Sequence, residues 1–319
     1  MTQQCPWQGL NLDFTGVVFD GGDFSGAAFS GARVSFDRAT FSGGQVSFND
    51  AVFSDGQVSF AETVFSGGGV YFDRAVFSGA QVFFVFSEFS RGTVQFENAK
   101  FSKGQVHFDF AKFSGGEVSF QRAKFSGGAV YFQRAKFSDG QVDFGYAEFS
   151  GGQVAFASAT FSGGRVDFGH ARFSDGPVVF PTATFSGGQV SFNDAGFSGG
   201  QVSFVRAVFS GGEVAFDRAE FSSGPVSFRG ATFSSGLVSF KGAMLSGAQI
   251  SFEGFGIYQD DAEGVTLSGG LVDFSEVGDW TVPPIFGWGG TPPAGLKLPA
   301  QPGTTSPDGA PSGADGPSG

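Results

Sequence analysis

A twelve-residue repeat dominates the sequence. From Phe29 onward a new unit starts every twelve residues through Leu245, so that nineteen units follow one another without a break in register. The first position is Phe in every unit but the last, the sixth is Val in every unit but the last, and the eighth is always Phe. The remaining outward positions accept polar and charged residues of many kinds. Constant apolar columns beside variable polar columns predict a solenoid, in which stacked units bury one continuous core.

The spacing within a unit predicts short extended segments. In Ala39-Thr40-Phe41 a small residue stands two positions before a large one, and Val46-Ser47-Phe48 has the same pattern. Residues i and i+2 of an extended chain point to one face, so both belong to the core. Each unit thus contains two five-residue segments and a two-residue spacer such as Gly44-Gln45. Ala replaces Gly at the fourth position of three units, so that corner is expected to need a small side chain rather than a positive φ.

This pattern resembles the pentapeptide-repeat family, whose unit is a small residue, any residue, Leu or Phe, and two further residues. The resemblance covers roughly residues 10–275 and implies an all-β fold, a right-handed quadrilateral parallel β-helix with four faces per coil. Regular members of the family lack spacers. Two twelve-residue units are therefore expected to close one coil of about 24 residues, because a twelve-residue coil would be too thin to hold its Phe, Val and Ala side chains.

Composition and register predict five parts in the chain. Trp7 and Leu10 are expected to cover the first Phe layer, and Gly, Pro and Ser dominate the far end. An insertion of ten residues interrupts the repeat after Phe252. The predicted parts are an N-terminal cap (1–11), the β-helix (12–252), an acidic surface loop (253–266), the last repeat with a C-terminal cap (267–300), and a disordered tail (301–319).

Charge is distributed in bands. The net charge is −12, yet residues 90–136 carry eight basic and three acidic residues, so this band is +5 and the rest of the chain is −17. No stretch reaches membrane-spanning length, and the lone Cys5 excludes an intramolecular disulfide. The expected location is the cytoplasm, and the resemblance implies a bacterial source.

The sequence offers little support for catalysis. Its two histidines, His107 and His170, have no Cys, Asp or His nearby at metal-ligand spacing. The Ser-Gly-Gly segments recur at nearly every corner and lack the Lys of a phosphate-binding loop, so turn geometry explains them better. We therefore expect a protein that is not an enzyme and that holds no metal or cofactor.

Stacking the sequence at two units per coil gathers aromatic side chains on one outward surface. The seventh-position and tenth-position columns both become aromatic in the same coils, and two lysines lie in a third column alongside. Contiguous exposed aromatic residues indicate a contact surface, although a ladder that only steadies the sheet is the alternative. The predicted binding patch consists of Phe83, Phe86, His107, Phe110, Tyr131, Arg134, Lys112 and Lys136.

Three functions fit these observations. The first is a non-enzymatic interaction or structural scaffold, whose patch contacts an unidentified protein or a second copy of the chain as a homodimer. The second follows from the resemblance, since some pentapeptide-repeat proteins mimic duplex DNA and bind DNA gyrase. The acidic net charge agrees with that role, but the positive central band opposes it. The third is nucleic-acid binding through the band, which the overall acidity opposes.

Overall fold

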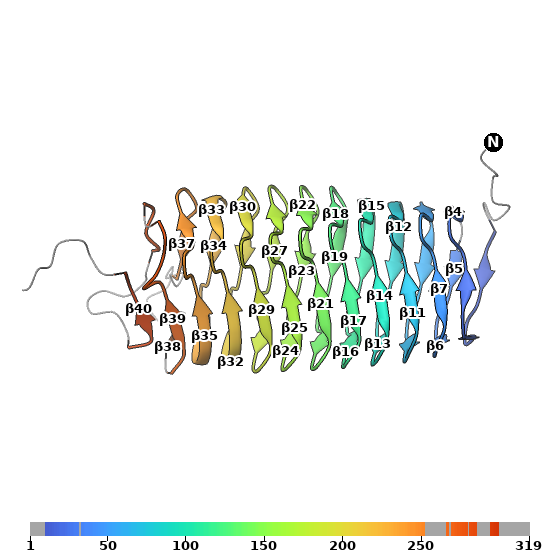
Figure 1. Cartoon of the computed structure of the whole chain (residues 1–319), viewed down its shortest axis with the longest axis horizontal. Helices are drawn as coiled ribbons and strands as arrows, with labels where there is room; N and C mark the ends of the chain where they lie inside the picture. Colours follow the sequence, from blue (N-terminus) through green and yellow to red (C-terminus); the bar gives the residue numbers. More distant parts are fainter. Residues whose placement is uncertain are drawn as a thin grey trace, which may run out of the picture.

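The chain winds into a parallel β-helix (Figure 1). The computed structural model describes residues 10–31, 33–252, 266–267, 269–279, 281–285 and 294–299. These residues form strands and turns without a helix, so none of them belongs to a helix that could span a membrane. Val64 pairs in parallel with Thr40 on one side and Glu88 on the other. This offset of two repeat units confirms the predicted coil and the predicted all-β solenoid.

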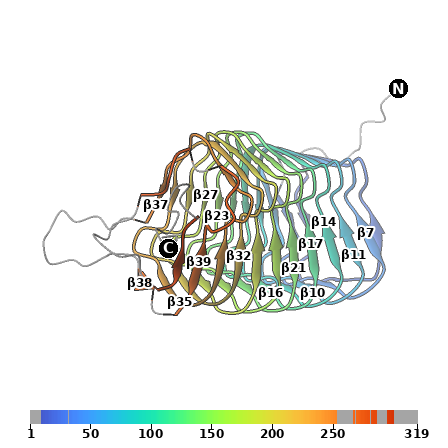
Figure 2. The same ribbon diagram turned by 60° about the vertical axis from the view of Figure 1, so that its left-hand side comes forward.

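One coil contains four strands, which supply its four faces. In a central example, β8 (Val52–Ser54) and β9 (Gln57–Ser59) come from one unit, and β10 (Val64–Phe65) and β11 (Gly69–Tyr71) come from the next. The first two belong to one sheet and the other two to a second sheet. Most twelve-residue units therefore make two strands of one sheet, with a bend at the spacer, before the chain crosses to the other sheet. Figure 2 shows the coils stacked one behind another.

Within the described residues the first sheet contains 19 strands, two from most alternate units. Besides β8 and β9 they are β1 (Leu12–Asp13), β4 (Ala28–Ser30), β5 (Arg33–Ser35), β12 (Val76–Phe83), β15 (Lys100–His107), β18 (Lys124–Phe125), β19 (Ala129–Tyr131), β22 (Glu148–Phe149), β23 (Val154–Ala155), β26 (Arg172–Phe173), β27 (Val178–Val179), β30 (Gly196–Ser198), β31 (Val202–Ser203), β33 (Glu220–Ser223), β34 (Val226–Ser227), β36 (Met244–Leu245) and β37 (Ile250–Ser251).

The second sheet contains 21 strands in the part of the chain that the structure describes, and they come from the other units. Besides β10 and β11 they are β2 (Val18–Phe19), β3 (Gly22–Asp23), β6 (Thr40–Phe41), β7 (Gln45–Ser47), β13 (Glu88–Phe89), β14 (Thr93–Gln95), β16 (Lys112–Phe113), β17 (Glu117–Ser119), β20 (Lys136–Phe137), β21 (Gln141–Asp143), β24 (Thr160–Phe161), β25 (Arg165–Asp167), β28 (Thr184–Phe185), β29 (Gln189–Ser191), β32 (Val208–Ala215), β35 (Thr232–Ser239), β38 (Thr266–Leu267), β39 (Leu271–Asp273) and β40 (Leu296–Lys297).

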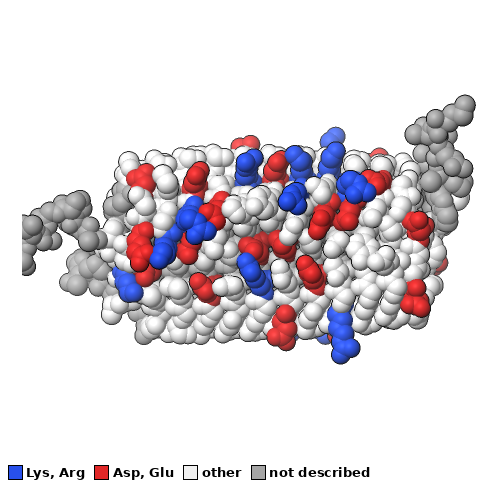
Figure 3. All heavy atoms as spheres, viewed as in Figure 1, with Lys and Arg blue, Asp and Glu red and all other residues white. Residues whose placement is uncertain are grey.

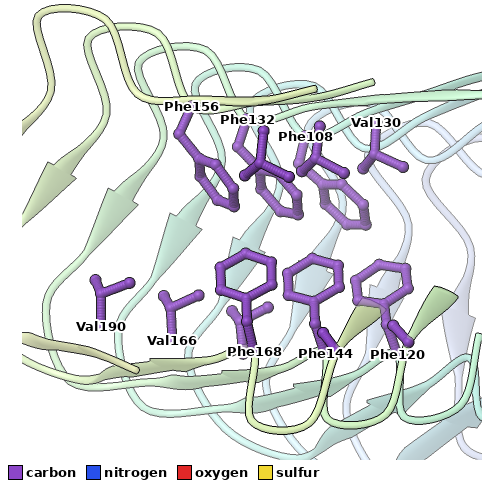
Figure 4. Close-up of a cluster of buried hydrophobic side chains, with 14 of the residues drawn as sticks. Phe108, Phe120, Val130, Phe132, Phe144, Phe156, Val166, Phe168 and Val190 are labelled. Atoms are coloured by element: carbon purple, nitrogen blue, oxygen red, sulfur yellow. The ribbon is translucent and has the colours of Figure 1, made fainter. Parts of the chain in front are cut away.

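Columns of phenylalanine fill the interior. Phe84 and Phe108, one coil apart, stack with ring centroids 4.7 Å apart and planes inclined by 3°. Eighth-position columns of the two sheets meet edge to face, as Phe108 and Phe120 do at 5.9 Å and 88° (Figure 4). Offset-stacked and edge-to-face pairs are the arrangements that aromatic rings prefer. Each interior ring therefore combines burial with favourable ring geometry, and no metal or disulfide is needed to explain the stability of the rod.

Turn corners join one sheet to the other. At Phe36-Asp37-Arg38-Ala39 the backbone N–H of Ala39 donates to the carbonyl of Phe36 over 3.0 Å, and Arg38 has a φ of 57°. A positive φ at the third residue of such a four-residue turn is the mark of a type II turn. Every tenth-position residue from Arg38 to Gly242 has this positive φ, most of them without being glycine. The varied side chains of that column hid this requirement from sequence analysis.

At the spacer of each unit, which we call the spacer corner, the sheet bends between the two strands of that unit. A Cβ built on Gly152 would lie 2.1 Å from the carbonyl oxygen of Gly128 in the preceding coil, so this corner has no room for a side chain unless the backbone shifts. Alanine is accepted at the same position at Ala80 and Ala248, as expected, whereas Gly152 is more crowded than the expectation assumed. The expectation that no positive φ is required was wrong for part of the column, because residues such as Gly44 have a φ of 63°.

The two ends depart from the regular two-unit offset. Val18 pairs with Thr40 at an offset of 22, whereas Thr232 pairs with Thr266 at an offset of 34. The ten-residue insertion predicted after Phe252 is therefore absorbed without shifting the strands that follow.

Several sequence predictions concern residues outside the described ranges. They include Trp7 of the N-terminal cap, the acidic residues of the loop, and the tail, so the five-part division stays a prediction. Within the described residues, Leu10 is exposed. Ile285 N–H donates to Ile250 over 2.8 Å and adds a further partner to the first sheet.

Candidate functional site

The two turn corners of each coil lie on opposite sides of the rod, and their side chains differ. Tenth-position residues two units apart come one above another because the strands that flank each turn pair at that offset. The first of these columns contains Glu62, Phe86, Phe110, Arg134 and Ser158, and the second contains Asp50, Arg74, Asn98, Arg122, Tyr146, His170, Asp194 and Arg218.

The first column and the seventh-position residues beside it form what we call the aromatic corner, which consists of Phe83, Phe86, His107, Phe110, Tyr131 and Arg134. Strands β12, β15 and β19 place Phe83, His107 and Tyr131 in direct register. The ring centroids of Phe83 and His107 lie 5.1 Å apart, and those of His107 and Tyr131 lie 4.9 Å apart. A second stack runs beside the first, since the rings of Phe86 and Phe110 lie 4.7 Å apart.

Part of the aromatic corner is open to solvent. Phe86 is 57% exposed and Phe110 is 36% exposed, whereas the repeat phenylalanines of the core are buried. The guanidinium carbon of Arg134 lies 5.4 Å from the ring centroid of Phe110, which is within the range of a cation–π contact. The stack thus ends in a positive charge at one side.

Hydrogen bonds hold the His107 ring in place between its aromatic neighbours. Its Nδ1 lies 3.0 Å from Oδ2 of Asp109, and its Nε2 lies 3.2 Å from Oε1 of Gln105. The other carboxylate oxygen of Asp109 accepts a hydrogen bond from the backbone N–H of Gln133 over 3.0 Å. Both ring nitrogens therefore face acceptor oxygens, which fix the orientation of the ring within the aromatic stack.

The two lysines of the predicted patch stand on the adjoining face of the second sheet. Lys112 and Lys136 are in register with each other, and Lys112 is also in register with Glu88. Both side chains are exposed, and neither makes an ion pair with any residue that the structure describes. The structure therefore brings all eight predicted residues to one side of the rod, the aromatic ones at the turn and the lysines beside it.

The second column forms what we call the mixed corner, which consists of Asp50, Arg74, Arg122, Tyr146, His170, Asp194 and Arg218. At one end Arg74 donates two hydrogen bonds to Asp50, over 2.8 and 2.7 Å. At the other end Arg218 donates two to Asp194, over 2.8 and 2.6 Å. The bond from Arg218 is the main reason that the pKa of Asp194 lies below its usual value.

Aromatic contacts extend the ion pair of Arg218 and Asp194 along the mixed corner as far as Arg122. The guanidinium carbon of Arg122 lies 5.5 Å from the ring centroid of Tyr146, and that ring stacks on His170 at 4.7 Å. The Nε2 of His170 in turn lies 4.0 Å from Oδ2 of Asp194. Sequence analysis treated His170 as an isolated residue. Reading the column as far as Arg218 would have revealed the whole ladder.

Charges of both signs are interspersed over the face seen in Figure 3. No group of three metal-ligating side chains gathers among the residues that the structure describes.

Comparison with known proteins gives limited information. No family model matches the chain, and no curated protein sequence matches it. Solved structures similar to it include two trypsin-treated variants of QnrB1, a plasmid-mediated fluoroquinolone resistance protein. They are 15% and 14% identical, each alignment covers 84% of this chain and 91% of QnrB1, and the TM-score is 0.20 for both. A likeness of this size identifies neither family nor function, so the pentapeptide-repeat resemblance stays a prediction, and the strand register of the chain itself defines its β-solenoid.

Proposed function

We propose that this protein is a non-enzymatic interaction module, a rigid β-helical rod that presents the aromatic corner and its two lysines to a partner protein. The observation that carries the proposal is the pair Phe86 and Phe110. These rings are 57% and 36% exposed, and they stack at 4.7 Å on two successive turns.

The turn backbone at Phe86 and Phe110 is unfavourable for a phenylalanine. Both residues have a φ of 60°, in the left-handed region that bulky side chains rarely adopt. Exposed phenyl rings also lose the free energy that burial would contribute. The same column accepts Ser158, Thr182 and Gly230 in other coils, so the fold does not require aromatic residues here. Exposed aromatic residues that the fold does not need are characteristic of contact surfaces.

The charge around the corner indicates the chemistry of the partner. Arg134, Lys112 and Lys136 border the rings on the side of Phe110, whereas Glu62 precedes Phe86 in the same column and Glu88 is in register with Lys112. A complementary surface would combine apolar side chains with acidic ones. The partner we propose is a protein with an acidic surface segment that contains apolar residues.

Affinity capture from host lysate tests the proposal. The baits are the wild-type protein, the double variant Phe86→Ser/Phe110→Ser, and the matched control Tyr146→Ser/His170→Ser. Serine already occupies the turn position at Ser158, so all three baits are expected to fold. We expect a partner that the wild type and the control retain and the first variant loses. Binding of the purified partner should also weaken as salt is added, because screening reduces the attraction between opposite charges.

The outcome that would overturn the proposal is a set of captured proteins that is the same for all three baits. Should the captured protein be the chain itself, sedimentation distinguishes the homodimer. In that case the wild type sediments as a dimer and Phe86→Ser/Phe110→Ser as a monomer.

A second candidate function is inhibition or protection of DNA gyrase. The net charge of −12 on an elongated solenoid favours it, whereas the +5 band in residues 90–136 interrupts the negative potential that a DNA mimic presents. Supercoiling by purified gyrase in the presence of excess protein decides between the two. Inhibition that survives Phe86→Ser/Phe110→Ser would support the DNA mimic, and supercoiling at the normal rate would remove it.

A further inference from the structure

One outward column of the first sheet contains a glycine that the backbone does not need. The column follows the twelfth repeat position through strands that pair in register, and Gly196 stands between Arg172 and Glu220. In the first eighteen units Gly196 is the only glycine at this position. Its φ is outside the left-handed region, and a Cβ built on it would meet no atom within 4 Å.

Comparison with a spacer glycine shows how unusual this is. At Gly200 a Cβ would lie 2.5 Å from the carbonyl oxygen of Gly176, so the packing of the coils excludes a side chain there. Nothing comparable limits Gly196. A glycine inside a strand weakens the strand, since it adds conformational freedom to the unfolded chain and contributes no side-chain contact. In the folded protein, the missing side chain of Gly196 leaves open space on the outer surface of the sheet at this position.

Two shallow hollows meet above Gly196. One, of about 600 Å³, lies between this column and the mixed corner, and its wall includes Tyr146 and His170. The other, of about 350 Å³, lies on the opposite side of the column and is bordered by serine hydroxyls. Both hollows are lined by Glu148, Arg172, Gly196 and Glu220.

Where the two hollows meet, their shared wall contains one cation and one carboxylate that form no ion pair with a described residue. We call this shared region the hollow above Gly196. Arg172 and Glu220 are one coil away from Gly196 on either side, which places their Cα atoms about 9–10 Å apart. Neither side chain makes an ion pair with a residue that the structure describes. Nearby charges are already engaged, as Lys124 is with Glu148 at 3.0 Å. A ligand that entered the hollow would therefore meet a cation at one end and a carboxylate at the other.

We propose that the hollow above Gly196 binds a free α-amino acid as its zwitterion. The guanidinium of Arg172 receives the α-carboxylate, for which its planar fork of donors is suited, and Glu220 receives the α-ammonium. The hydroxyls of Ser174, Ser198 and Ser222 border the site and supply neutral hydrogen-bonding groups. This site is separate from the aromatic corner, so the proposal does not depend on the proposed function.

Amide chemical shifts of the ¹⁵N-labelled full chain test this. The probes are the standard L-amino acids, added one at a time. For each that binds, its N-acetyl derivative retains only the carboxylate and its amide retains only the ammonium. We expect at least one amino acid to shift the amide signals of Arg172, Gly196 and Glu220 saturably, and each half-ligand to bind at least about tenfold more weakly. Absence of a saturable shift with every amino acid, or half-ligands that bind as tightly as the parent, would overturn the proposal.

Gly196→Thr separates binding from folding. Threonine occupies the same repeat position at Thr160 and Thr184, so this variant should fold with a thermal midpoint at or above that of the wild type while its side chain projects between Arg172 and Glu220. We expect it to lose amino-acid binding, and Val208→Thr, at the same position on the second sheet, to retain it. Arg172→Gln and Glu220→Gln should each weaken binding at least about tenfold. Unchanged binding by a folded Gly196→Thr variant would show that the ligand binds elsewhere.

Discussion

The aromatic corner and the mixed corner share a backbone and differ in almost everything else. Both are built on a column of tenth-position residues with a positive φ, and in both each side chain lies above the one from the preceding coil. At the aromatic corner two phenyl rings stack in the open, and at the mixed corner two bidentate ion pairs enclose a tyrosine and a histidine. The repeat thus determines the backbone and the interior, while the outward columns are free to acquire a local chemistry.

A single register explains how both corners form. Because an offset of two units brings each outward side chain onto its counterpart in the next coil, neighbouring residues of a column contact one another whatever they are. Aromatic residues in successive coils then stack, and residues of opposite charge pair. Whether an outward side chain finds an aromatic or oppositely charged neighbour therefore depends on the residues 24 positions away, not on those beside it in sequence.

The largest expected effect comes from removing a buried ring of the core that lies beneath the outward columns. Phe132 is fully buried and stacks on Phe108 at 4.8 Å and on Phe156 at 4.7 Å. We expect Phe132→Ala to lower the free energy of unfolding by about 3–5 kcal/mol. Urea denaturation measures this loss, with Phe86→Ala as the surface control expected to cost less than about 1 kcal/mol. Equal losses would mean that the aromatic corner supports the sheet, and would weaken its role as a contact surface.

An intermediate effect should come from the turn backbone, and it should be the same at both corners. Ser158 and Asn98 have φ values of 55° and 57° on opposite sides of the rod. We expect Val at either position to be less stable than Gly by about 1–2 kcal/mol, because a β-branched residue fits the left-handed region poorly. Thermal unfolding of the four single variants checks the order. A difference found at one corner only would contradict the equivalence of the two turns.

The smallest expected effect is the dependence of stability on acid pH, which should arise at the mixed corner and not at the aromatic corner. Hydrogen bonds from Arg74 and Arg218 hold the pKa of Asp50 and of Asp194 below the usual 3.8. A lowered pKa in the folded state adds stability above pH 3.8, and this contribution is lost as the pH falls through the lowered value. These pairs are exposed, so we expect Asp50→Asn/Asp194→Asn to cost no more than about 1 kcal/mol per pair at neutral pH.

Urea midpoints measured between pH 2 and pH 7 test this expectation. The Asn variant should show a shallower loss of stability in acid than the wild type. Phe86→Ser/Phe110→Ser should follow the wild-type curve, because it removes no carboxylate. An acid response that the Asn substitutions leave unchanged would show that these ion pairs contribute nothing measurable.

Much of the fold could be predicted because its determinants are the invariant positions. Phe36 and Val46 belong to columns that hardly vary, so their burial and the length of the coil follow from counting. The positive φ at Arg38 could not be found in this way, since a backbone conformation tolerated by Arg, Phe and Asp leaves no mark in the composition of its column.

The candidate site was only partly accessible from sequence. Stacking the columns at two units per coil predicted the neighbours of Phe86 and His107, and the structure brings those residues together. Side-chain hydrogen bonds such as that between His107 and Asp109 depend on rotamers, which spacing does not specify. The role of Gly196 was hidden for another reason. Gly196 is one of 54 glycines, and the sequence does not distinguish it from those that the backbone requires. Only the structure shows that a side chain would fit at this position.

The alternation of units between two sheets has a consequence for how such a chain can change length. A gene duplication or deletion of one twelve-residue unit would preserve the core, but it would rotate everything downstream by half a turn. Every later residue of the aromatic corner's column would then stand on the side of the mixed corner. Changes by two units, or an insertion that keeps the strands in register like the one before Thr266, leave both sides intact. If either surface is under selection, related chains should therefore differ in length by an even number of twelve-residue units.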